Sequence, residues 1–97
     1  MRIVDKDLLR EFASAWQCEF CGKRTPNGCD PAHIFSRGAG RVDVRENLVS
    51  LCAICHRKSH AGHRPNRADL LSIAAKRENT TVEAIEALVY GTRRKPK

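Results

Sequence analysis

Metal-binding side chains are concentrated in one short stretch, LCAICHRKSHAGH, which runs from Leu51 to His63. It holds two cysteines and three histidines, the residue types that bind transition metals through sulfur and imidazole nitrogen. A second CxxC pair stands earlier in the chain, at Cys18 and Cys21. The question is whether these side chains form one metal site, two sites with different tasks, or an ordinary polar surface.

The four paired cysteines, Cys18-x2-Cys21 and Cys52-x2-Cys55, have the spacing of a four-cysteine zinc site. Each pair presents two thiolates from one tight turn, and two such turns can surround a tetrahedral Zn²⁺ ion. We expect this closed site to be structural and to stabilise a chain whose core is small. An iron–sulfur cluster or four unligated cysteines are the alternatives. The fifth cysteine, Cys29, has no partner at a useful spacing and is expected to be a free thiol.

The histidines need a separate explanation if the four thiolates satisfy one zinc ion. His56 and His60 are four residues apart on a predicted helix, so they share one face. An i, i+4 histidine pair can hold a divalent cation efficiently, and the alternative is a pair of solvent-exposed histidines on a polar helix. His63 follows at i+7, but Gly62 is expected to end the helix before it. These observations predict a second cation site on this helix.

The elements before this helix are predicted from local patterns. A helix over about 5–16 has Asp5 as a candidate N-cap and one apolar face, with Trp16 as a packing residue. Short extended runs at 32–36 and 46–52 predict a β-hairpin around a basic loop that contains glycines.

The elements that follow are predicted to be helical. Helical spacing covers 53–61, and further helices are expected over about 67–78 and 81–90. The last of these should open with a capping box that starts at Thr80. We expect the final two helices to pack against the core rather than to form a helix-turn-helix. The basic tail, 92–97, is expected to be disordered.

The composition limits the class of protein. A chain of 97 residues is one small domain, 1–97. Eighteen Lys and Arg residues against 11 Asp and Glu give a net charge of +7, and the excess lies mainly after residue 50. This favours a polyanionic partner such as nucleic acid, although a merely soluble basic surface is the alternative. There is neither an apolar run of the roughly 20 residues that cross a membrane nor a secretory signal, so a cytoplasmic location is expected.

Three segments resemble the HNH endonuclease family: Pro31-Ala-His-Ile34, Asn47-Leu-Val-Ser-Leu-Cys52 and Cys55-His-Arg-Lys-Ser-His60. The resemblance covers a core of residues 18–62, with both CxxC turns in place. It implies a small α+β fold with a ββα-metal, treble-clef-like core, in which a β-hairpin and the following helix grip one catalytic cation. The N-terminal helix and the two C-terminal helices would flank this core.

The resemblance also implies a role for each matching residue. His33 is expected to be the general base that activates water, because a neutral imidazole can accept a proton near neutral pH. Asn47 is expected to brace the hairpin loop so that His33 is held in place. His56 and His60 are expected to bind the catalytic cation, which would stabilise the negative charge that develops on a scissile phosphate.

One position departs from the family pattern. Many members carry His or Asp just before the base as a further cation ligand, whereas this chain has Ala32. Asp30 is the nearest candidate to replace it. Imidazole ligands favour Mn²⁺, Co²⁺, Ni²⁺ or Zn²⁺, whereas Mg²⁺ prefers oxygen, so Mn²⁺ is the expected catalytic cation and Mg²⁺ a weaker one.

Together these features predict a metal-dependent DNA endonuclease, a hydrolase that nicks one strand per active site with low sequence specificity, as a monomer or weak homodimer. Basic side chains are expected to contact phosphates; these are Arg37, Arg41, Arg45, Arg57, Lys58 and Arg64. The alternative is a non-catalytic, zinc-stabilised nucleic-acid-binding module of HNH ancestry. A CxxC redox protein is not expected, since no βαβ pattern surrounds either motif.

Overall fold

The computed structural model describes residues 4–35 and 42–93, and the side chains of residues 90–93 lie outside this description. Its elements, in chain order, are α1 (Lys6–Ala13), β1 (Asp30–His33), the 3-10 turn η1 (Arg45–Asn47), β2 (Leu48–Leu51), α2 (Ala53–His60), α3 (Arg67–Arg77) and α4 (Val82–Arg93). The two strands form an antiparallel sheet. The predicted small α+β fold is therefore confirmed, with a strand–strand–helix unit from β1 to α2.

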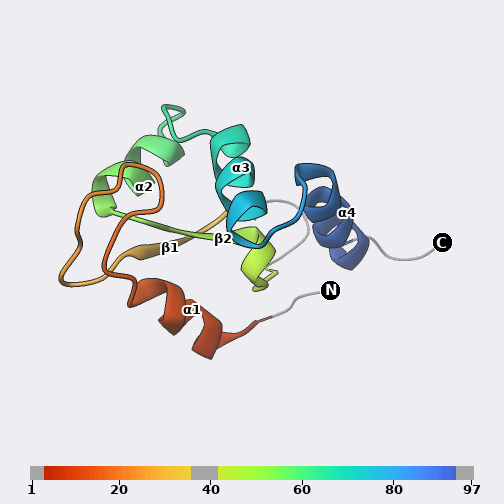
Figure 1. The fold of residues 1–97 in the computed structure, drawn as a ribbon, viewed down its shortest axis with the longest axis horizontal. Helices are drawn as coiled ribbons and strands as arrows, with labels where there is room; N and C mark the ends of the chain where they lie inside the picture. The colour runs from red at the N-terminus through yellow and green to blue at the C-terminus, as the bar shows by residue number, and fades with distance from the viewer. Residues whose placement is uncertain (1–3, 36–41, 94–97) are drawn as a thin grey trace.

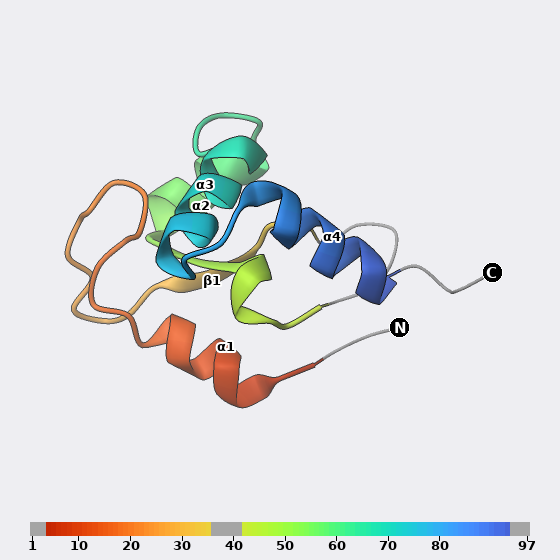
Figure 2. The ribbon, with the colours of Figure 1, turned by 45° about the vertical axis from the view of Figure 1, so that its right-hand side comes forward.

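The sheet lies between helices on both faces, with α1 on one side and α2 and α3 on the other (Figures 1 and 2). Ser50 faces α1, where its Oγ donates a hydrogen bond to the Phe12 carbonyl at 2.8 Å. Val49 faces the opposite way, pairs with Ala32 of β1 and belongs to the main core. All four residues of β2 are buried, as a strand covered on both faces requires.

The main hydrophobic core joins the sheet to the C-terminal helices. Helix α3 contributes Leu70, Leu71, Ala74 and Ala75, and α4 contributes Ile85 and Val89. Both helices therefore pack against the core, as the sequence predicted.

One arginine ties α3 to the sheet and to the first CxxC turn. Arg77 Nη1 lies 2.9 Å from both carboxylate oxygens of Glu19, and its Nη2 donates to the Leu48 carbonyl at 2.9 Å. Glu19 in turn accepts the Ser50 N–H at 2.7 Å. Three segments distant in sequence are thus bonded through a single guanidinium group.

Polar side chains cap the helices. Asp5 caps α1 through its side chain, as predicted. Asn66 and Asp69 form a capping box at α3 that the sequence analysis did not identify. Thr81 rather than Thr80 caps α4, because its Oγ1 accepts a backbone N–H at 3.1 Å. The predicted capping box of Thr80 and Glu83 is therefore wrong: with Thr81 as the cap, the third helical residue is Ala84, whose side chain cannot bond back to the cap.

The N-terminal helix is shorter than predicted. It ends at Ala13, and Trp16 is 64% exposed, so the prediction that Trp16 packs in the core is wrong. The competing structure is the first CxxC turn. Gln17 forms a β-bridge with Arg24, and the Thr25 N–H donates to the Trp16 carbonyl at 2.7 Å. These backbone bonds take residues 16 and 17 out of the helix.

Both predicted strands differ from the observed ones at their ends. β1 begins at Asp30 and ends at His33, whereas the prediction ran over 32–36. β2 begins at Leu48, because the preceding residues form η1. The helix predicted over 53–61 is confirmed to within one residue, and α4 continues through Gly91 to Arg93. The remaining predicted tail, 94–97, lies outside the described residues.

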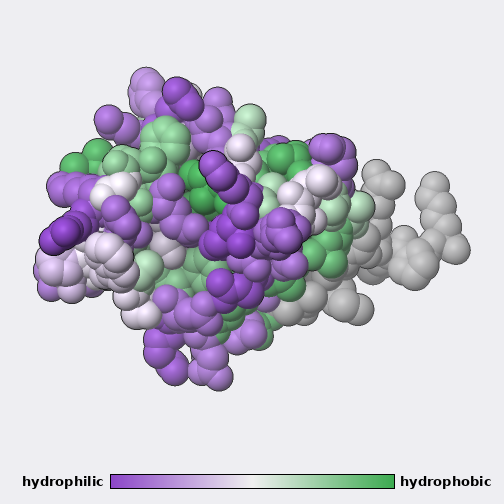
Figure 3. All heavy atoms as spheres, in the orientation of Figure 1, coloured by the Kyte–Doolittle hydropathy of each residue, from purple (hydrophilic) through white to green (hydrophobic). Residues whose placement is uncertain are grey.

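The face of the molecule seen in Figure 3 is mostly hydrophilic, with apolar areas scattered between polar side chains. Among the described residues, the exposed large hydrophobic side chains are Val4, Trp16, Ile54 and Leu88. None of the described helices has the length and apolar character needed to cross a membrane.

Candidate metal centre and active site

Four thiols converge where the first CxxC turn meets the start of α2. The sulfur atoms of Cys18, Cys21, Cys52 and Cys55 all lie within 4.8 Å of one another. Cys21 Sγ and Cys52 Sγ are 3.8 Å apart. Two sulfurs bound to one tetrahedral zinc ion at about 2.3 Å are themselves about 3.8 Å apart. The donor set and its spacing therefore suit a single structural zinc ion, which this cluster could hold.

The backbone around the sulfurs is shaped for this convergence. Gly22 has a φ of +77°, a left-handed conformation that glycine adopts without a Cβ clash. Its N–H donates to the Cys18 carbonyl at 3.1 Å, which closes the first turn. In the second turn Cys52 is the N-cap of α2, and its sulfur accepts the Cys55 N–H at 3.5 Å.

The thiols do not ionise alike. Burial raises the pKa of Cys18, but hydrogen bonds from the backbone of Cys52, Cys21 and Phe20 outweigh it and lower this pKa to about 7. Burial, reinforced by hydrogen bonds with the other three thiols, raises the pKa of Cys55 well above its ordinary value. A bound cation would remove the repulsion between thiolates and displace the remaining protons.

Cys29 stands outside the cluster. It is buried, and its sulfur lies 3.2 Å from Thr25 Oγ1. Burial raises its pKa, so the thiol is held in its neutral form. This agrees with the predicted free thiol.

The two histidines of α2 point their Nε2 atoms at each other. His56 Nε2 and His60 Nε2 are 3.0 Å apart. Two imidazole nitrogens bound at 2.0–2.1 Å to one cation, at a right angle, are about 3 Å apart. This pair therefore has the separation of two ligands of a single ion.

Asp30 contacts the opposite nitrogen of the first histidine. Its Oδ2 lies 3.2 Å from His56 Nδ1. Asp30 and His60 thus meet opposite corners of the His56 ring, and these three side chains do not face a common point. Over residues 4–35 and 42–93, the four cysteines are the only group of three or more His, Cys, Asp or Glu side chains arranged to hold a metal ion.

His33, at the end of β1, is paired with a carboxylate that the sequence analysis missed. Its Nε2 lies 2.7 Å from Asp43 Oδ1; the His33 side chain is 20% exposed and that of Asp43 is 0% exposed. No local signal in the sequence predicts it: in the alternation Val42-Asp43-Val44 the valines are expected to face inward and Asp43 outward, whereas Asp43 is buried.

Asn47 is completely buried and bonds to the backbone on both sides of the segment 36–41. Its backbone carbonyl also accepts the Ile34 N–H at 2.9 Å. Asn47 therefore lies where it can brace the residues that follow His33, and its catalytic role stays a prediction.

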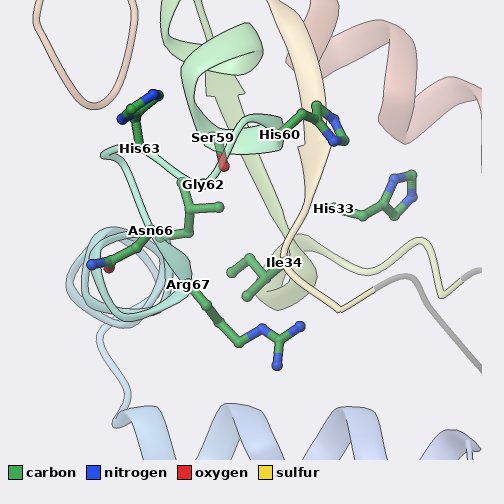
Figure 4. A pocket seen from close by; sticks show the side chains of 9 residues that line it. His33, Ile34, Ser59, His60, Gly62, His63, Asn66 and Arg67 are labelled. Carbon is green, nitrogen blue, oxygen red and sulfur yellow. The ribbon is translucent and has the colours of Figure 1, made fainter.

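His33 and His60 line the same cavity, of about 340 Å³, between the end of β1, the end of α2 and the start of α3. In Figure 4 their rings lie to one side of this cavity, whereas the His63 ring projects the other way. Ile34 and Leu70 give the cavity apolar wall, and Arg67 gives it a cation. The Arg67 guanidinium lies 4.8 Å from the centre of the Phe35 ring.

Arg45, one of the predicted DNA contacts, is already paired within the protein. Its guanidinium bonds to the Glu11 carboxylate, and its Nε lies 3.3 Å from both oxygens of Glu78. It also lies 5.3 Å from the centre of the Phe12 ring. The hydrogen bond to Glu11, with the nearby charge of Glu78, raises the pKa of Arg45 further.

The other predicted contacts fall into three groups. Arg64 forms an ion pair with Asp69 at 2.9 Å. Arg57 and Lys58 are exposed on α2, and their side chains have no partner among the residues that the structure describes. Two more, Arg37 and Arg41, lie outside the described residues.

Comparison with known proteins gives one result. Residues 18–62 match the family described as HNH endonuclease. No curated protein and no solved structure matches the chain. The family match confirms the resemblance and indicates a nuclease-family or nucleic-acid-binding role for this segment.

Proposed function

With the HNH endonuclease match of residues 18–62 as the premise, we propose that this chain is a metal-dependent endonuclease that hydrolyses phosphodiester bonds in DNA. It would nick one strand per active site, with low sequence specificity. The observation that supports this best is that the candidate base, His33, and a candidate cation ligand, His60, line one cavity.

The first requirement is a group that takes a proton from the attacking water. A neutral imidazole does this near neutral pH. His33 is partly exposed and borders the cavity, so water and substrate can reach it. Asn47 holds the backbone that follows His33, through its carbonyl bond to Ile34.

The second requirement is positive charge at the scissile phosphate. His56 and His60 would hold a divalent cation through their Nε2 atoms, and such an ion would stabilise charge on the phosphate and the leaving oxygen. In this proposal Asp30 orients His56 through Nδ1 instead of binding the ion. Mn²⁺, Co²⁺ or Ni²⁺ would suit these imidazole ligands better than Mg²⁺.

The zinc cluster would serve the site indirectly. Cys52 and Cys55 lie at the junction of β2 and α2, and Cys18 and Cys21 belong to the turn before β1. An ion bound there would fix the first turn of α2 against the rest of the domain. The helix that carries the two histidines would thereby be held in place.

The alternative is a non-catalytic, zinc-stabilised module that binds nucleic acid. One observation favours it: over the described residues, only the cysteines form a complete metal-holding group. Exposed Arg57 and Lys58 would serve such a module equally well. The two functions differ in what they require of His33, because a binding module does not need a base.

A plasmid-nicking assay distinguishes the endonuclease from the non-catalytic binding module. Zinc-loaded protein should convert supercoiled plasmid to the nicked form when Mn²⁺ is added, and a chelator should stop it. His33→Ala should lower the rate by about 100-fold or more, since a general base contributes about 10²- to 10⁴-fold. DNA binding without nicking in both proteins would establish the module. Nicking that persists in His33→Ala would contradict the assigned base.

Metal binding tests the ligands separately. Added Mn²⁺ should broaden the NMR signals of the His56 and His60 rings in the zinc-loaded protein, because the ion is paramagnetic. The His63 ring, which points away in Figure 4, provides an internal comparison. Equal broadening of all three rings would contradict the proposed ligand pair.

A further inference from the structure

A buried carboxylate that the proposed reaction does not yet use lies beside the candidate base. The Asp43 side chain is 0% exposed. Burying a carboxylate is costly unless hydrogen bonds replace its lost hydration. Its hydrogen-bond partners therefore decide what it can do there.

The two oxygens of this carboxylate meet different donors. Asp43 Oδ1 lies 2.7 Å from His33 Nε2, and Oδ2 accepts the backbone N–H of Asp5 at 2.8 Å. A carboxylate in its ionised form only accepts hydrogen bonds, and in that form its partner His33 Nε2 carries the proton. Within residues 4–35 and 42–93, His33 Nδ1 has no hydrogen-bond partner.

We propose that Asp43 is a positioning residue that fixes His33 as the Nε2–H tautomer, so that Nδ1 is the nitrogen that takes the proton from water. The inference rests on the proposed function for its catalytic consequence. The carboxylate also holds the ring in one orientation and stabilises the imidazolium that forms as the proton is taken up. A buried Asp that orients a catalytic His works in this way in serine proteases.

The backbone next to both residues is held by one residue, Asn47, through its side chain and its backbone carbonyl. Asn47 Nδ2 donates to the carbonyl of Val42, the neighbour of Asp43, at 2.9 Å, and the Asn47 carbonyl accepts the N–H of Ile34, the neighbour of His33. Asn47 therefore sets the position of the base and of the carboxylate together. The backbone N–H of Asp5, the N-cap of α1, also holds the Asp43 carboxylate in place.

Asp43→Asn would keep the shape of the side chain and reverse its effect on the tautomer of His33. The single oxygen of the asparagine side chain can satisfy only one of the two donors. If that oxygen keeps the Asp5 N–H, the amide group faces His33 Nε2 and must donate to it. The ring would then carry its proton on Nδ1, and the base would be lost.

The experiment compares wild type, Asp43→Asn and Ser50→Ala as zinc-loaded full-length proteins. Ser50 is also buried, and its loss removes a hydrogen bond to Phe12 that involves neither His33 nor Asp43. Nicking kinetics with Mn²⁺ give kcat and KM, with the folded fraction measured by circular dichroism. Heteronuclear NMR of the His33 ring nitrogens at about pH 8, where imidazole is neutral, gives the tautomer without any need for activity.

The expected result has two parts. Wild type and Ser50→Ala should show the Nε2–H tautomer, and Asp43→Asn should show the Nδ1–H tautomer. In Asp43→Asn kcat should fall by about 100-fold or more with KM changed by no more than about twofold, while folded Ser50→Ala should keep kcat.

Two results would overturn the inference. One is an unchanged tautomer in Asp43→Asn, whatever its activity. The other is a kcat of folded Asp43→Asn equal to that of Ser50→Ala. If wild type itself does not nick DNA, the proposed function fails, and the tautomers still decide whether Asp43 sets the state of His33.

Discussion

The Asn47 side chain pairs with the backbone of Phe35 in both directions: Oδ1 accepts its N–H at 2.9 Å, and Nδ2 donates to its carbonyl at 3.1 Å. An adjacent β-strand would form the same two hydrogen bonds with Phe35. Because the Asn47 side chain forms them instead, β1 ends at His33. Nδ2 also donates to the Val42 carbonyl at 2.9 Å. One side chain thus joins the residues before and after the segment 36–41.

Asn47→Ala should be strongly destabilising for this reason. It removes the three hydrogen bonds that the Asn47 side chain makes to buried backbone groups, and the loss of such a bond costs about 1–3 kcal/mol. We expect a loss of about 3 kcal/mol or more in the free energy of unfolding, measured by urea denaturation of the zinc-loaded protein. Asn66→Ala, which removes the exposed cap of α3, should cost only about 1 kcal/mol. Equal losses in the two variants would contradict this assignment.

A pair of cysteine substitutions tests the structural zinc site. Cys21→Ser removes one of the four converging sulfurs, so the protein should lose zinc and most of its helical circular dichroism. Cys29→Ser changes a buried thiol outside the cluster and should retain zinc. Metal analysis of the purified proteins gives the answer. Equal zinc content in the two variants would refute a four-cysteine site.

Zinc binding should weaken as the pH falls. The pKa of Cys18 is lowered from its ordinary value of 9.0 to about 7. The contribution of its thiolate to the folded cluster is therefore complete above about pH 9 and is lost as the pH falls through about 7. Cys55 has a raised pKa and is protonated in the zinc-free protein at neutral pH, so zinc must displace its proton. Affinity should therefore fall about tenfold per pH unit for each proton released. Competition with a chromophoric chelator below about pH 7 measures this slope, and a pH-independent affinity would contradict it.

Spacing along the chain was enough to predict which cysteines and which histidines lie close together. The two CxxC pairs specify their own turns, and the i, i+4 spacing of His56 and His60 specifies a shared helix face. These are local relationships, and the structure shows the four sulfurs and the two Nε2 atoms close together. The packing role predicted for Trp16 was wrong, because helical periodicity does not show where a competing turn begins.

Apart from the caps of α3 and α4, the relationships that were missed are distant in sequence. Asp43 meets His33 where the Asn47 side chain bonds to the Val42 carbonyl and the Asp5 N–H bonds to the Asp43 carboxylate, and no local pattern reports that geometry. Arg45 was predicted to contact DNA from its place in a basic loop. Its partner Glu78 comes from the end of α3, 33 residues later, and only the folded structure brings the two together.

This difference among the arginines predicts a matched pair of effects on DNA affinity. Arg57 is exposed on the helix that carries the candidate cation ligands and has no partner among the described residues, so it is available to a phosphate. Arg57→Ala should weaken binding equally for unrelated DNA sequences and reduce the slope of log affinity against log salt by about 1. Fluorescence anisotropy at several salt concentrations measures both quantities.

Arg45→Ala should behave differently, because this guanidinium is already bonded to Glu11 and Glu78. Its side chain is 43% exposed, so solvent screens these ion pairs and their loss should cost no more than about 1 kcal/mol of stability. The salt slope should stay that of wild type. A slope reduced by Arg45→Ala and unchanged by Arg57→Ala would mean that Arg45 exchanges its carboxylate partners for phosphate on binding, and that DNA lies across α1 and η1 instead of α2.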